Sequence, residues 1–93
     1  MREEVEEEKF LIEKFEFIKK LSRYYAWKFN LERDDLFQEG CLATILIFRK
    51  YSNSHSNEEV KKIATKVSNR AIYRFIKEEL NRRKAVEESH DLN

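Results

Sequence analysis

Seven residues between Asp35 and Arg49 combine polar and aliphatic side chains at helical spacing. On a helical wheel they share one side of a helix predicted from about Asp34 to Tyr51. They are Asp35, Gln38, Glu39, Leu42, Ile45, Leu46 and Arg49. A solvent-facing helix of a monomer seldom displays two leucines and an isoleucine, so this pattern predicts a protein-binding surface. The alternative is a central helix that its neighbours cover on both sides.

A basic stripe follows in the last third of the chain. It consists of Lys62, Lys66, Arg70, Tyr73 and Lys77, with Arg74 at its boundary with an apolar face. Lysine and arginine neutralise phosphates, and a tyrosine can stack on a base, so the stripe predicts nucleic-acid binding. A solvated basic face balanced by Glu78 and Glu79 would explain the same residues.

The remaining reactive residues do not form a catalytic or metal-binding pattern. His55 lies in a predicted loop and His90 in a predicted tail, and neither has metal-ligand spacing with Cys41. The sequence contains no glycine-rich phosphate loop and no nucleophile elbow. We therefore expect no enzyme activity and no cofactor or metal.

Composition limits the class of fold and the compartment. The 93 residues fit one small domain, and the absence of proline, the single glycine and the 40% charged residues favour long helices. One cysteine excludes an intramolecular disulfide, and no apolar run approaches the roughly 20 residues of a membrane span. We expect a cytoplasmic, all-α protein with a compact three-helix domain over residues 9–84. Residues 1–8 are acidic and expected to fray, and residues 85–93 are expected to form a flexible tail.

Hydrophobic periodicity predicts three helices, over about Val5–Phe29, Asp34–Tyr51 and Glu58–Arg83, with a polar loop at 52–57. The apolar stripe of the first contains Leu11, Phe15, Ile18, Ser22, Tyr25, Ala26 and Phe29. That of the second contains Leu36, Gly40, Ala43, Ile47 and Tyr51, and that of the third Val60, Ile63, Ala64, Val67, Ala71 and Phe75. The small Gly40 and Ala43 should let a neighbouring backbone approach closely.

The stretch from Leu31 to Gly40 resembles the start of the second helix in region two of bacterial RNA polymerase sigma factors. The family pattern of Asp-Leu, one apolar residue and Gln-Glu-Gly corresponds here to Asp35-Leu36-Phe37-Gln38-Glu39-Gly40. The resemblance extends from about Phe15 to Arg83, and it implies a sigma region-two-like fold. It also implies that Asp35, Gln38 and Glu39 bind the clamp helices of the polymerase β′ subunit, with Leu42 and Ile45 as apolar contacts.

The same resemblance implies contact with the −10 promoter element through the third helix, with Arg70 and Tyr73 at the upstream edge of that element. Housekeeping sigma factors have several aromatic residues in this helix, where the present chain has Ile63, Lys66 and Val67. The departure points to an alternative or phage-type factor, and strand opening does not follow from the resemblance.

The resemblance also bears on partners. A complete sigma factor has a second domain for the −35 element, so we expect a separate companion subunit to supply it, and an anti-sigma factor is a further expected partner. Two other interpretations remain open. One is a regulator that occupies the sigma-binding surface of the polymerase without reading DNA, and the other is an unrelated helical domain that self-associates.

Overall fold

The computed structural model describes residues 2–91, with side chains over residues 6–87. It contains three helices, α1 (Arg2–Phe29), α2 (Arg33–Tyr51) and α3 (Asn57–Asp91), and no strand within the described residues. The predicted all-α class and the three helices are confirmed.

The third helix is longer than predicted. Its expected end near Arg83 is wrong, because α3 continues to Asp91, and α1 begins at Arg2 rather than at Val5. The fraying of residues 1–8 and the flexibility of residues 85–93 stay predictions. Met1 and residues 92–93 lie outside the described residues.

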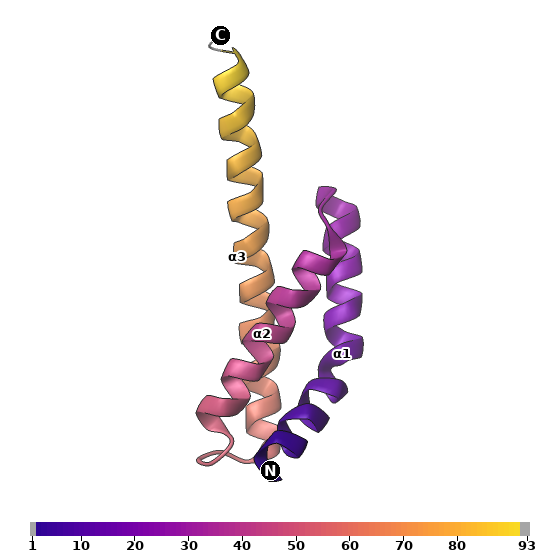
Figure 1. Ribbon diagram of the computed structural model, residues 1–93, viewed down its shortest axis with the longest axis vertical. Helices are drawn as coiled ribbons and strands as arrows, with labels where there is room; N and C mark the ends of the chain where they lie inside the picture. The colour runs from indigo at the N-terminus through magenta and orange to yellow at the C-terminus, as the bar shows by residue number, and fades with distance from the viewer. Residues whose placement is uncertain (1, 92–93) are drawn as a thin grey trace.

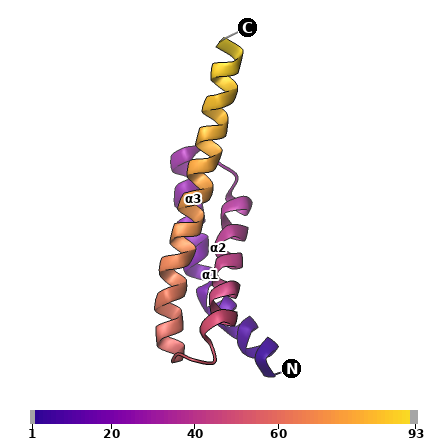
Figure 2. The ribbon, with the colours of Figure 1, turned by 90° about the vertical axis from the view of Figure 1, so that its left-hand side faces the viewer.

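The molecule is elongated. Helix α2 lies obliquely in front of α3 and beside α1, and it contacts both, whereas α1 and α3 touch each other at few places (Figure 1). The C-terminal part of α3 projects well past the other two helices (Figure 2). The extents along the principal axes are therefore 57 × 22 × 21 Å, and the expected compact shape is wrong.

Local signals in the sequence explain where the helices end. Asn30 has a positive φ of 55°, and the Leu31 amide donates to the Ala26 carbonyl at 3.0 Å. This is the pattern of an α-helix that ends in a single residue of left-handed conformation. The Arg83 guanidinium donates to the Asn30 carbonyl at 2.8 Å, so α3 also fixes the end of α1. At the start of α3, the Ser56 hydroxyl accepts a hydrogen bond from the Glu59 amide at 3.2 Å.

Two apolar clusters form the core. One consists of Phe10, Phe48, Val60 and Ala64, and the other of Ile18, Leu36, Ile72 and Ile76. Buried Thr44 lies on α2 and buried Ser68 on α3, and each hydroxyl donates within its own helix, to the Gly40 and Thr65 carbonyls. The hydroxyls of Thr44 and Ser68 are therefore paired, whereas that of the third buried polar residue, Ser22, has no partner.

The buried face of α3 differs from the predicted stripe. Residues Val60, Ala64, Ser68, Ile72 and Ile76 are buried, whereas the predicted core residues Ile63, Val67, Ala71 and Phe75 are only half-buried. The buried residues follow steps of four. Because α2 crosses α3 obliquely, the contact follows a ridge of this spacing rather than a line parallel to the helix axis.

Gly40 of α2 lies against side chains of both α1 and α3. A Cβ atom at this position would lie 2.7 Å from Ile18 Cγ2 of α1 and 3.0 Å from Ile72 Cδ1 of α3. The predicted close approach is present, but side chains rather than a backbone occupy the space beside Gly40. Only glycine fits without displacing these isoleucines.

Candidate functional site

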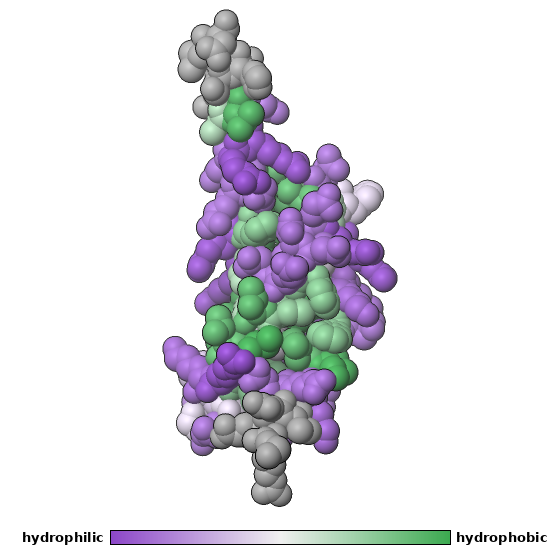
Figure 3. Space-filling view, viewed as in Figure 1, coloured by the Kyte–Doolittle hydropathy of each residue, from purple (hydrophilic) through white to green (hydrophobic). Residues whose placement is uncertain are grey.

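The outer face of α2 consists of the seven residues Asp35, Gln38, Glu39, Leu42, Ile45, Leu46 and Arg49. Leu42 is 56% exposed and Leu46 is 61% exposed, while Ile45 is half-buried. Asp35 and Gln38 are exposed and Glu39 is half-buried, one to two turns closer to the start of the helix. The space-filling view shows an apolar area where the middle and end of α2 face the viewer (Figure 3).

This arrangement follows from how α2 packs. Its inner side holds Leu36, Gly40, Ala43 and Phe48 against the other two helices, so the opposite side has no described helix over it. Two exposed leucines on one helix side are apolar surface that remains in water. The outer face can therefore bury aliphatic area against a partner, with polar side chains at one end to set the register.

Arg49 differs from the rest of the outer face because it is engaged within the chain. Its Nε donates to Glu7 Oε2 at 3.1 Å and its Nη2 donates to Glu7 Oε1 at 3.0 Å. This hydrogen-bonded carboxylate raises the pKa of Arg49. The contact ties the end of α2 to the start of α1, so a partner would have to compete with Glu7 for this guanidinium.

The basic stripe of α3 comprises Lys62, Lys66, Arg70, Tyr73, Arg74 and Lys77, and all six residues are exposed. Four of them, from Arg70 onward, line one open hollow of about 630 Å³ together with Asn69 and Tyr25. Lys62 and Lys66 lie one to two turns before this hollow. Arg74 was predicted at the edge of the core, and the structure leaves it exposed.

Aromatic residues from two helices line this hollow. Tyr73 is 48% exposed, and the Lys77 ammonium lies 5.4 Å from the centre of its ring. Tyr25 of α1 was assigned to the core from periodicity, but it is half-buried and reaches the same hollow. The spacing of Tyr25 along α1 could not show that it lines the hollow, because a tyrosine at the edge of the core and one that faces a groove have the same position on a helical wheel. The hollow offers cations and π faces, the groups that bind single-stranded nucleic acids.

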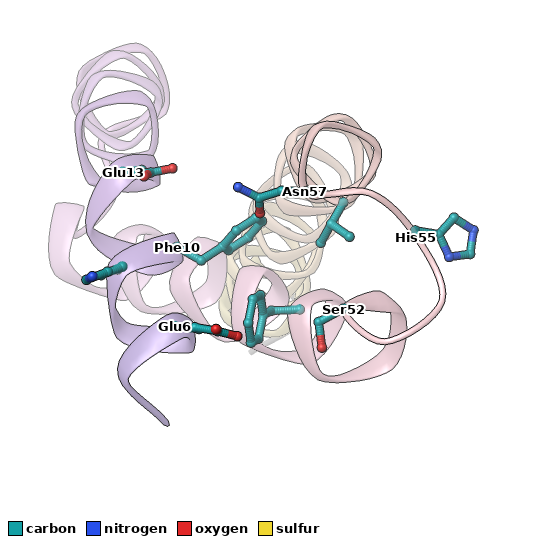
Figure 4. A pocket seen from close by; sticks show the side chains of 9 residues that line it. Glu6, Phe10, Glu13, Ser52, His55 and Asn57 are labelled. Atoms are coloured by element: carbon teal, nitrogen blue, oxygen red, sulfur yellow. The ribbon is translucent and has the colours of Figure 1, made fainter. Parts of the chain in front are cut away.

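A second hollow, of about 380 Å³, lies where the start of α1 meets the loop between α2 and α3 (Figure 4). Glu6, Phe10, Glu13, Ser52 and Asn57 surround it, whereas the His55 ring points away (Figure 4). His55 Nδ1 lies 2.8 Å from the Ser54 hydroxyl. Both residues lie in the exposed loop, and the His55 ring is not directed into the hollow.

No group of three or more His, Cys, Asp or Glu that could hold a metal ion occurs in the part of the chain that the structure describes. Cys41 is half-buried, and burial raises the pKa of its thiol, which disfavours the reactive thiolate. Within the same residues, none of the helices has the length and apolar character needed to span a membrane.

Comparisons of the chain with protein-family models, with curated proteins and with solved structures found no match. The features of the chain that bear on its function are therefore the two surfaces described above and the sequence pattern that begins at Asp35.

Proposed function

We propose that this chain is a sigma-like subunit of RNA polymerase. It binds the clamp helices of the β′ subunit through the outer face of α2, and it contacts −10 promoter DNA through the basic stripe of α3. The observation that carries the proposal is the outer face itself. There, Asp35 and Gln38 precede the exposed Leu42 and Leu46 on a helix side that the chain's own helices leave open.

The chemistry of this face suits a helical protein partner with charged groups. An interface gains most of its affinity from a central apolar region, and polar anchors around that region fix the orientation. Leu42, Leu46 and the half-buried Ile45 supply the apolar region. Hydrogen bonds between Gln38 or Glu39 and a charged partner are each worth about 1.5 to 3 kcal/mol.

The DNA-binding part of the proposal is supported by the hollow beside α3. Arg70, Arg74 and Lys77 can neutralise phosphates, while Tyr73 and Tyr25 expose ring surface in the same hollow. No ion pair within the described residues involves these cations, so their charges remain for a ligand. The carboxylates Glu78 and Glu79, which the solvated-face interpretation requires as counter-charges, do not pair with them.

Co-purification with core polymerase tests the first part. The double variant Gln38→Ala with Glu39→Ala, and separately Leu42→Asp, should lose polymerase binding and keep their helical circular dichroism. Val86→Asp is the matched control, since Val86 is a 53% exposed aliphatic residue on the projecting part of α3. Wild-type binding by both outer-face variants would overturn the proposal.

Binding to a single-stranded −10 oligonucleotide, with and without polymerase, tests the second part. The affinity should fall with rising salt, and Arg70→Ala with Tyr73→Ala should abolish it. Lys84→Ala, which removes an exposed charge outside the hollow, should cause only a small loss. If wild-type protein binds polymerase but no DNA, the chain is instead a regulator that occupies the sigma-binding surface.

A further inference from the structure

A smaller hollow, of about 210 Å³, lies between α1 and the first residues of α2. Its lining consists of Lys19, Ser22 and Arg23 from α1 and of Arg33, Asp34 and Phe37 from α2. Three cationic side chains thus face one carboxylate, so the hollow has a net positive charge. This Ser22 hollow contains no residue of the outer face of α2 and none of the basic stripe of α3.

Ser22 is the unusual member of this set. The residue is 0% exposed, and its hydroxyl oxygen has no hydrogen-bond partner, the only buried side-chain oxygen or nitrogen of this kind among residues 6–87. By contrast, the buried hydroxyls of Thr44 and Ser68 both donate to carbonyls. A buried hydroxyl without a partner is unfavourable, and an acceptor atom in the hollow that Ser22 lines would satisfy it.

The start of α2 contributes a second source of positive potential. Glu32 occupies the N-cap position, but its side chain does not cap the helix, and the first helical hydrogen bond runs from the Leu36 amide to the Glu32 carbonyl. The amides of Arg33, Asp34 and Asp35 therefore precede the helical hydrogen-bond pattern. An anion beside these amides interacts favourably with the dipole of the 19-residue helix.

Two of the cations that line the hollow repel each other when no ligand is bound. Lys19 and Arg23 are four residues apart on α1, where like charges repel each other. Neither they nor Arg33 form an ion pair with any carboxylate among residues 6–87, although Asp34 lines the same hollow. An anionic ligand would neutralise this repulsion.

From these observations we infer that the Ser22 hollow binds a phosphate-type oxyanion. Arg23 and Arg33 donate hydrogen bonds from their planar guanidinium groups to the anion, and Lys19 adds a positive charge. The Ser22 hydroxyl donates a hydrogen bond to one oxygen of the anion. Phe37 supplies an apolar wall, and Asp34 opposes the anion and so limits its affinity. The phosphate group belongs either to a small solute or to the backbone of a nucleic acid.

Nuclear magnetic resonance of the full chain with inorganic phosphate and with pyrophosphate tests the inference, at an ionic strength held constant with chloride. Saturable shifts are expected at the amides of Arg33, Asp34 and Asp35 and at Ser22. Shifts that do not saturate, or that chloride reproduces, would show an adventitious ion only and would overturn the inference.

Variants identify the groups that bind. Ser22→Ala, which removes the unpaired hydroxyl without adding volume, and Arg23→Gln, at an exposed position, should each weaken phosphate binding about tenfold. Asp34→Asn should tighten binding, because it removes the only opposing charge of the lining. Lys84→Gln, which removes an exposed positive charge outside both the Ser22 hollow and the basic stripe, is the control and should change the affinity less than about twofold. Equal effects of Arg23→Gln and Lys84→Gln would contradict a built site.

A single-stranded oligonucleotide distinguishes the two sources of phosphate. If it displaces phosphate from the hollow, and still does so in the Arg70→Ala and Tyr73→Ala variant, the ligand is a nucleic-acid phosphate. If phosphate stays bound when the oligonucleotide is saturating, the ligand is a small solute. Polymerase binding is read separately through Gln38 and Glu39, so failure of either proposal leaves the other testable.

Discussion

The two sides of α2 carry the same kind of residue in opposite surroundings. Leu36 on the inner side is 0% exposed, packed with Ile18, Ile72 and Ile76, whereas Leu42 on the outer face is 56% exposed. A buried leucine contributes about 2 to 3 kcal/mol through its removal from water, and an exposed one contributes little to folding. The difference teaches that the apolar residues on the inner side of this helix stabilise the chain, whereas those on the outer face leave apolar surface in water.

The largest expected effect is the difference in stability between truncating a leucine on the inner side of α2 and truncating one on its outer face. Leu36→Ala should lower the free energy of unfolding by about 2 to 5 kcal/mol, because it leaves a cavity among fully buried side chains. Leu42→Ala and Leu46→Ala should change it by less than about 0.5 kcal/mol. Urea unfolding followed by circular dichroism measures all three.

If Leu42→Ala lowered the free energy of unfolding as much as Leu36→Ala, the two sides of α2 would not differ. The outer face would then be covered in solution. Stability that rises with protein concentration would then identify a second copy as the cover. This result would favour the self-associating helical domain over the polymerase-binding subunit.

A smaller effect is expected at the centre of the inner side. Gly40→Ala should destabilise the chain by about 1 kcal/mol, since crowding costs about 1 to 3 kcal/mol and alanine recovers up to about 1 kcal/mol of helix propensity. The added Cβ would lie 2.7 Å from Ile18 Cγ2, so a double-mutant cycle with Ile18→Ala measures the crowding directly. The double variant should lose less stability than the sum of the single ones. Additive losses would place the crowding elsewhere.

The smallest effect is expected at the edge of the outer face. Arg49→Ala breaks the contact with Glu7, and because the Arg49 side chain is 65% exposed, the loss of stability should be slight and should disappear at high salt. Lys62→Ala, an exposed cation without an ion pair in the described residues, is the control. A large, salt-independent loss would make Arg49 part of the fold and would remove it from the partner-binding residues.

Much of the fold could be predicted from the sequence because the signals are local. The break after Phe29, the polar loop at 52–57 and the two-sided apolar pattern of α2 all follow from residue type and spacing. The core of α3 could not be predicted in the same way. Ile72 and Ile76 are buried instead of Ala71 and Phe75, because the oblique crossing of α2 selects a row of four-residue steps.

The two surfaces of the proposed function were visible as patterns, whereas the Ser22 hollow was not. Its lining comes from two helices, and the sequence assigns Ser22 to an ordinary core stripe. Nothing in a helical wheel shows that the buried hydroxyl has no partner. That observation requires the packed neighbours of Ser22.

The sequence by itself determined that this chain is helical, where its loops lie, that one side of α2 combines polar and aliphatic residues, and that one side of α3 is basic. Those properties depend on residues within a few positions of one another. The tertiary structure decided which apolar residues are covered, that Gly40 lies against two isoleucines, and that Tyr25 and Tyr73 share a hollow. It also decided the position of Ser22 beside three cations. The physical reason is that burial and pairing depend on crossing geometry between helices, which spacing along one helix does not encode.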